Sequence, residues 1–74
     1  MNAAQLKKGN RALIVKINAD KVLKDRLNSF GIMKEEELII KGCSLAKQTI
    51  EIEVGSTLIA LRKDEAEKIE VKKI

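Results

Sequence analysis

The stretch from Thr49 to Leu61 restricts the fold more than any other part of the chain. Apolar residues occupy every second position of Ile50–Val54 and glutamates stand between them, as in a β-strand with one buried and one wet face. Gly55-Ser56 suits a two-residue turn of type II′, and Thr57–Leu61 is a second apolar run. The segment therefore predicts a β-hairpin with a well-defined register.

Three further segments have the length and composition of strands. Arg11–Ile17 is rich in Leu, Ile and Val and is predicted to be buried at least partly on both faces. Glu37–Gly42 is predicted as a second strand and Ile69–Ile74 as the last one. Asn2–Lys8 is a polar lead-in with at most one helical turn, and Gly9-Asn10 supplies a turn before the first strand.

One helix is predicted between the first two of these strands. Asp20 is a suitable N-cap, and Gly31 stands where the end of a helix favours left-handed geometry. Its apolar face is expected to consist of Leu23, Leu27 and Phe30. A single helical turn is predicted at Asp64–Lys68, capped by Asp64.

Five short antiparallel strands and one helix within 74 residues indicate a mostly β fold. Such strands hide their edges by curling into a small, partly open five-stranded β-barrel, with the helix covering one end. No linker, repeat or low-complexity segment divides the chain, so residues 1–74 are predicted to form a single domain. Since Phe30 is the only aromatic residue, the core must be aliphatic.

The composition argues against several function classes. The chain has no histidine and one cysteine, Cys43, so the commonest acid–base, nucleophilic and metal-site sets are absent. We expect neither an enzyme nor a bound cofactor or metal. No apolar run is long enough to cross a membrane and no disulfide can form within the chain, which predicts a soluble cytoplasmic protein.

Several motifs, taken in order, resemble the FeoA family. They are Lys8-Gly9, the run Arg26-Leu27-Asn28-Ser29-Phe30-Gly31-Ile32, Ile50-x-Ile52-x-Val54, Ile59-Ala60-Leu61-Arg62-Lys63-x-Glu65-Ala66 and Ile69-x-Val71. The resemblance spans nearly the whole chain. Two turns depart from the family pattern: Lys34-Glu35 stands where the family usually has Pro-Gly, and the later hairpin glycine is displaced to Gly55.

The resemblance implies an SH3-like barrel and an accessory role in bacterial ferrous-iron uptake. The implied partner is the membrane Fe(II) transporter of the FeoB type, whose cytosolic side carries a GTP-binding domain. The resemblance leaves three molecular roles open: an assembly factor, a regulator of nucleotide turnover and an adaptor. We favour an adaptor that binds this transporter, with modulation of its GTPase domain as an additional role to test.

Five residues are candidates for contact with a partner, and each has a structural alternative. Ile32, Met33 and Leu45 are apolar at positions where exposure is expected, but filling the core is the favoured alternative for them. Arg26 and Arg62 could contribute to a basic surface with neighbouring lysines, or their charges could simply be dispersed. Cys43 and the run Glu35-Glu36-Glu37 are weaker candidates as metal ligands, because neither offers a converging donor set.

The main rival function is nucleic-acid binding, since the net charge is +4. Against it, acidic residues such as Asp25 and Asp64-Glu65 interrupt the basic clusters, and no exposed aromatic platform is expected. Proline-peptide binding is excluded because the chain lacks Trp and Tyr. A freestanding counterpart of the SH3-like C-terminal domain of metal-dependent repressors, and a homodimer formed through an edge strand, remain alternatives.

Overall fold

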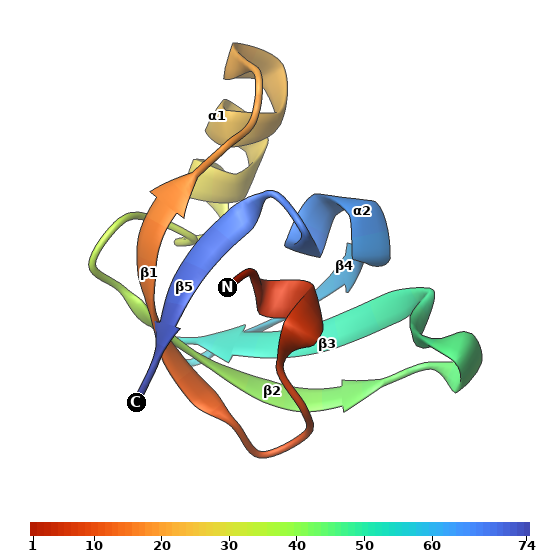
Figure 1. Ribbon diagram of the computed structural model, residues 1–74. Coiled ribbons are helices and arrows are strands. Elements are labelled where there is room, and N and C mark those ends of the chain that lie inside the picture. The colour runs from red at the N-terminus through yellow and green to blue at the C-terminus, as the bar shows by residue number, and fades with distance from the viewer.

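The computed structural model describes all 74 residues, except that the side chain of Lys47 is not described. Its strands are β1 (Arg11–Ile17), β2 (Glu37–Cys43), β3 (Thr49–Val54), β4 (Thr57–Arg62) and β5 (Ile69–Lys73). Its helices are α1 (Lys21–Ser29) and α2 (Lys63–Ala66), and two 3-10 turns are η1 (Ala3–Gln5) and η2 (Leu45–Lys47). The strands form one antiparallel sheet in the order β4-β3-β2-β1-β5, which curls into an open barrel (Figure 1). The predicted fold class is confirmed.

The β3–β4 hairpin is regular along its whole length. Its pairs run from Thr49 opposite Arg62 to Val54 opposite Thr57, without a bulge. Gly55 has φ 62°, and Ser56 does not share its positive φ, which agrees with a type II′ turn. The hairpin that the alternating pattern predicts is therefore present in the expected register.

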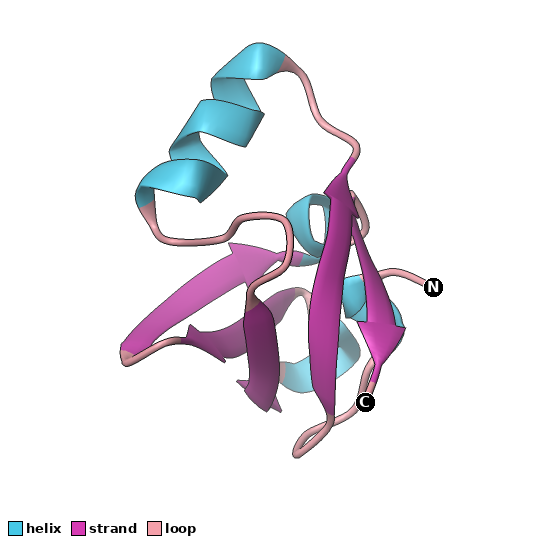
Figure 2. Cartoon of the chain, turned by 90° about the vertical axis from the view of Figure 1, so that its left-hand side faces the viewer, coloured by secondary structure: helices cyan, strands magenta, loops and turns pink.

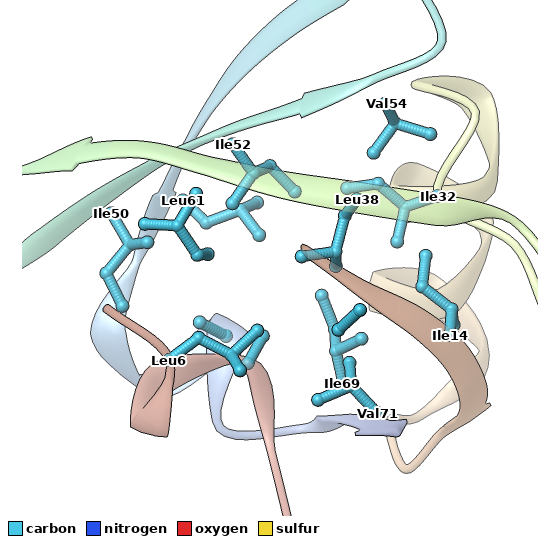
Figure 3. Packing of buried hydrophobic residues seen from close by; sticks show 14 of the residues in the cluster. Leu6, Ile14, Ile32, Leu38, Ile50, Ile52, Val54, Leu61, Ile69 and Val71 are labelled. Atoms are coloured by element: carbon cyan, nitrogen blue, oxygen red, sulfur yellow. The ribbon is translucent and has the colours of Figure 1, made fainter. Parts of the chain in front are cut away.

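The core is aliphatic, as predicted, and Figure 3 shows its side chains pointing into a shared interior. The largest fully buried side chains are Ile14, Leu27, Ile32, Leu38, Ile40, Ile52, Leu61 and Ile69. The N-terminal segment forms one turn, η1, as expected, but it is not merely a polar lead-in. Ala3, Ala4 and Leu6 are buried in the core cluster, because this segment covers the side of the barrel that the sheet leaves open.

Strand β1 agrees only in part with the prediction that it is buried at least partly on both faces: Leu13 is half-buried on the outer face, but the strand is exposed further along. Ala12 and Ile14 face the core, but a bulge between Ile14 and Lys16 breaks the alternation. Because of the bulge, the consecutive residues Val15 and Lys16 are both exposed, and Ile17 returns to the core. The strand thus presents an apolar and a basic side chain on its outer side.

Helix α1 begins and ends as the sequence predicts. The carboxylate of Asp20 accepts the N–H of Leu23 at 2.8 Å, and Gly31 has φ 90° beyond the C-terminus. Only Leu27 of the helix is fully buried, and Leu23 packs partly against the core. Phe30 is the C-cap and is exposed, so the predicted face of three core residues is wrong at its last position. The helix stands at one end of the barrel (Figure 2).

Helix α2 also differs from its prediction. It begins at Lys63 and its N-cap is Arg62, so Asp64 lies inside the first turn. The cap is closed by the side chain of Glu65, which accepts the backbone N–H of Arg62 at 3.0 Å. The usual N-cap residues, Ser, Thr, Asp and Asn, accept a hydrogen bond through their side chains, which an arginine cannot do. The sequence therefore predicts the start of α2 at Asp64 instead of at Lys63.

The turn at residues 33–36, where the sequence departs from the pattern of the family it resembles, has a well-defined geometry. The N–H of Glu36 donates to the carbonyl of Met33 at 3.1 Å, and Glu35 has φ 76°. A positive φ at the third position is that of a type II turn, which favours proline followed by glycine. Lys34-Glu35 therefore adopts a turn for which Pro-Gly would be the more suitable pair of residues.

Candidate partner-binding site

An open groove of about 640 Å³ lies between β1, α1 and the loop that follows α1. It is lined by Val15, Lys16, Ile17, Lys24, Asn28, Met33 and Lys34. The β1 bulge exposes the first two of these residues. Two backbone hydrogen bonds fasten the loop to β1 beside them: the N–H of Glu35 donates to the carbonyl of Ile14 at 2.7 Å, and that of Ile14 donates to the carbonyl of Glu36 at 2.8 Å. These backbone hydrogen bonds fix the position of the loop relative to β1, and so they define the shape of the groove.

The floor of the groove is apolar and partly open to solvent. Val15 remains 37% exposed and Met33 43% exposed, while Ile17 closes the floor from the core side. Neighbouring exposed apolar side chains in a concave site are typical of a contact surface. Methionine in particular adapts its shape to different partners.

The rim of the groove is basic. Lys16, Lys24 and Lys34 line it, and none of the residues lining it is acidic. The ion pairs among the described side chains are Arg11–Glu37, Lys21–Asp25 and Arg26–Glu65, so none of them neutralises a groove lysine. The groove therefore has the chemistry to hold a segment that carries both apolar and acidic side chains.

The structure separates the three predicted apolar contact residues. Met33 lies in the groove, whereas Ile32 beside it is fully buried next to the sheet and has no surface to offer. Leu45 is 96% exposed, but it lies in η2, beyond the far end of β2. A strand as long as β2 spans about 20 Å, so Met33 and Leu45 do not form one patch.

The two predicted contact arginines meet the same carboxylate. Arg26 of α1 donates to Oε2 of Glu65 at 2.8 Å, while Oε1 of Glu65 accepts the backbone N–H of Arg62. The Glu65 side chain is only 10% exposed. Arg26 thus ties α1 to α2, and the side chain of Arg62 lines a separate hollow with Gln48, Lys63 and Asp64.

Glu65 is the structural residue that sequence reasoning missed. The sequence pattern that indicates its role is the capping box, in which a glutamate stands three residues after the N-cap, as Glu65 does after Arg62. Without Ser or Thr at the cap, that signal is weak.

The weaker metal candidates do not converge. Glu37 pairs with Arg11 at 2.9 Å, and the exposed Cys43 lies at the end of β2. Among the residues that the structure describes, no group of three or more His, Cys, Asp or Glu side chains is arranged to hold a metal ion.

A five-stranded open barrel with one covering helix is the architecture of a small SH3-like domain, here with an apolar groove that has a basic rim. Residues 1–73 match the FeoA domain. A Campylobacter jejuni protein with the provisional name Fe(2+) transport protein A is 45% identical over 71 residues, which cover 96% of each chain. The chain therefore belongs to the FeoA family, which is involved in ferrous iron transport and is not a known enzyme family.

Solved structures share the fold of this chain. FeoA of Stenotrophomonas maltophilia, crystallised with zinc and described as a prokaryotic SH3 domain protein, superposes with a TM-score of 0.86 at 25% identity, covering 97% of this chain and 89% of that one. A manganese-dependent transcriptional repressor shares the fold over 40% of its own length and 99% of this chain, with a TM-score of 0.90 at 19% identity. No helix among the described residues is long and apolar enough to cross a membrane.

Proposed function

We propose that this protein is a cytoplasmic accessory protein of ferrous iron uptake that binds the membrane Fe(II) transporter on its cytosolic side. The α1–β1 groove, with Val15 and Met33 on its floor and three lysines on its rim, is the observation that carries the proposal. Its partner segment is acidic and amphipathic, and belongs to the GTP-binding domain or to the cytosolic end of the transporter core.

The groove favours a protein segment over a free anion or a nucleic acid. Covering the exposed parts of Val15 and Met33 contributes about 1 kcal/mol each, which a phosphate group cannot supply. Lysines at the rim contribute about 0.2–1 kcal/mol each and act mainly on the rate of association. The apolar floor therefore determines that the partner is a protein segment, and the lysines mainly increase the rate at which an acidic segment associates.

The test is equilibrium binding of the purified protein to the detergent-solubilised transporter from the same cell, with and without guanine nucleotide. Saturable binding is expected, and Met33→Asp should weaken it by at least about tenfold, because about 1.4 kcal/mol corresponds to a factor of ten. Replacing Lys16, Lys24 and Lys34 by glutamine should weaken binding and flatten its dependence on salt.

Leu45→Asp is the matched control, since it places the same charge at an exposed apolar position at the far end of β2. Loss of binding in Leu45→Asp with none in Met33→Asp would contradict the groove and move the contact to the β2–β3 loop. Binding to random RNA alone, falling steeply with salt, would replace the adaptor by the nucleic-acid alternative.

The same mixture shows whether the adaptor changes nucleotide turnover. The Stenotrophomonas protein is described as a candidate activating factor of bacterial ferrous iron transport. If this chain acts in the same way, GTP hydrolysis by the transporter rises with wild-type protein and does not rise with Met33→Asp.

A further inference from the structure

The two edge strands of the sheet, β5 and β4, differ in how far the rest of the chain covers them. Strand β5 is covered along its outer side by the N-terminal segment: the N–H of Val71 donates to the carbonyl of Met1 at 2.8 Å, and Asn2 forms an antiparallel bridge with Glu70. Strand β5 also carries Lys72 and Lys73. Covering segments and lysines are common protections of an edge strand against further pairing.

Among the residues that the structure describes, none covers the centre of strand β4, the other edge, with a backbone hydrogen bond. Because Val54 and Thr57 close a two-residue turn, Leu58 and Ala60 occupy the positions whose N–H and C=O point away from β3. The next outward amide, that of Arg62, is already bonded to Glu65. The free edge of β4 thus consists of Leu58 and Ala60, and it contains no bulge or proline.

We propose that β4 pairs with β4 of a second copy of this chain, antiparallel, about a two-fold axis at Ile59. In this register Leu58 lies opposite Ala60 of the second copy, and the two residues exchange their N–H and C=O groups in both halves of the interface. Ile59 keeps its pairing with Ile52 of β3. The association extends the sheet across both copies without disturbing either barrel.

The side chains on this edge are self-complementary. Leu58 is 58% exposed, and in the proposed register it packs beside the small Ala60 of the second copy. The two-fold symmetry gives two such Leu58–Ala60 pairs in the interface. No charged side chain lies at these paired positions, and Arg62 falls opposite Ser56 at each outer end, so like charges do not meet. A second copy therefore fits this edge better than a charged extended segment does.

Pairing of two short strands buries less surface than a standard interface of about 1,600 Å², so the dimer is weak. We expect a dissociation constant of about 0.1–1 mM. The groove residues lie on α1, β1 and the following loop rather than on β4. The dimer is consequently independent of transporter binding, and either proposal can fail alone.

The test measures sedimentation equilibrium and amide exchange on the full chain over a range of concentrations. At concentrations about ten times the dissociation constant, the average mass should approach that of a dimer, and the amides of Leu58 and Ala60 should exchange about two- to fivefold more slowly than in dilute solution. Amides paired within the barrel should not change.

Ala60→Pro removes one outward N–H and leaves the β3–β4 bonds in place, so it should abolish the mass increase. Leu58→Lys tests the same edge without changing the backbone, and Leu45→Lys is the matched exposed control. Exchange of the Leu58 and Ala60 amides that is independent of concentration overturns the proposal. A dimer that persists in folded Ala60→Pro and Leu58→Lys also overturns it, because the copies then meet through another surface.

Discussion

At the scale of single residues, Glu65 is important because its carboxylate accepts hydrogen bonds from two donors in different parts of the chain. It accepts the guanidinium of Arg26 at 2.8 Å and the N–H of Arg62 at 3.0 Å, with little exposure to solvent. It therefore caps α2 and attaches α1 at the same time. Arg26, which the sequence offers as a contact for a partner, is engaged in this internal bridge.

Glu65→Ala is expected to lower the free energy of unfolding by about 2–3 kcal/mol, from the lost cap and the lost charge-assisted hydrogen bond. Urea denaturation measures the change. Arg11→Ala is the control, because the Arg11–Glu37 pair is exposed on both sides and should contribute less than about 1 kcal/mol. Equal effects of the two substitutions would show that the buried position of Glu65 is unimportant.

At the scale of elements, the turn between α1 and β2 positions the groove. It directs Ile32 inward and Met33 outward, and it holds Glu35 at φ 76°, a conformation that costs a residue with a Cβ atom free energy. A glycine at this point would remove that cost. In this chain the turn is held in place by two backbone hydrogen bonds to β1.

Glu35→Gly is expected to stabilise the protein by about 0.5–1 kcal/mol, since relief of the strained φ outweighs the added freedom of the unfolded chain. Gly31→Ala should have the opposite effect at φ 90°, by about 1 kcal/mol, although no atom would clash with the new methyl group. Thermal unfolding compares both with Gly42→Ala, where φ is ordinary and space is open. Destabilisation by Glu35→Gly would refute the account of this turn.

At the scale of the whole molecule, the N-terminal segment completes the barrel. Leu6 is buried with Ala3 and Ala4, and the N–H of Gly9 donates to the carbonyl of Ile40 at 2.8 Å. A barrel of this size has no other layer to replace these contacts.

Leu6→Ala should therefore lower the free energy of unfolding by about 2–3 kcal/mol, in the range of a buried leucine truncation. Leu58→Ala, at an exposed leucine, should change it by less than about 0.5 kcal/mol when measured in dilute solution. Denaturant unfolding with both variants tests the assignment. A Leu6→Ala variant as stable as Leu58→Ala would mean that the segment is dispensable.

Features that depend on neighbours along the chain could be predicted from the sequence. The β3–β4 hairpin, the Asp20 cap and the left-handed Gly31 each follow from a few consecutive residues, because alternation, capping and φ preferences are local. The aliphatic core follows from the composition. The predictions were wrong where the local structure is unusual: the N-cap of α2 is Arg62 and not Asp64, and a bulge in β1 exposes Val15 and Lys16.

The candidate site depends on contacts between distant segments, which no local pattern encodes. Ile32 and Met33 are adjacent and similarly apolar, yet the loop bonded to Ile14 buries the first and exposes the second. The groove lysines come from β1, α1 and the following loop, and Arg26 meets a carboxylate 39 residues away. Chain order sets the strands and turns, but only the packing of the barrel decides which side chains share a surface, because burial and charge pairing depend on distance in space.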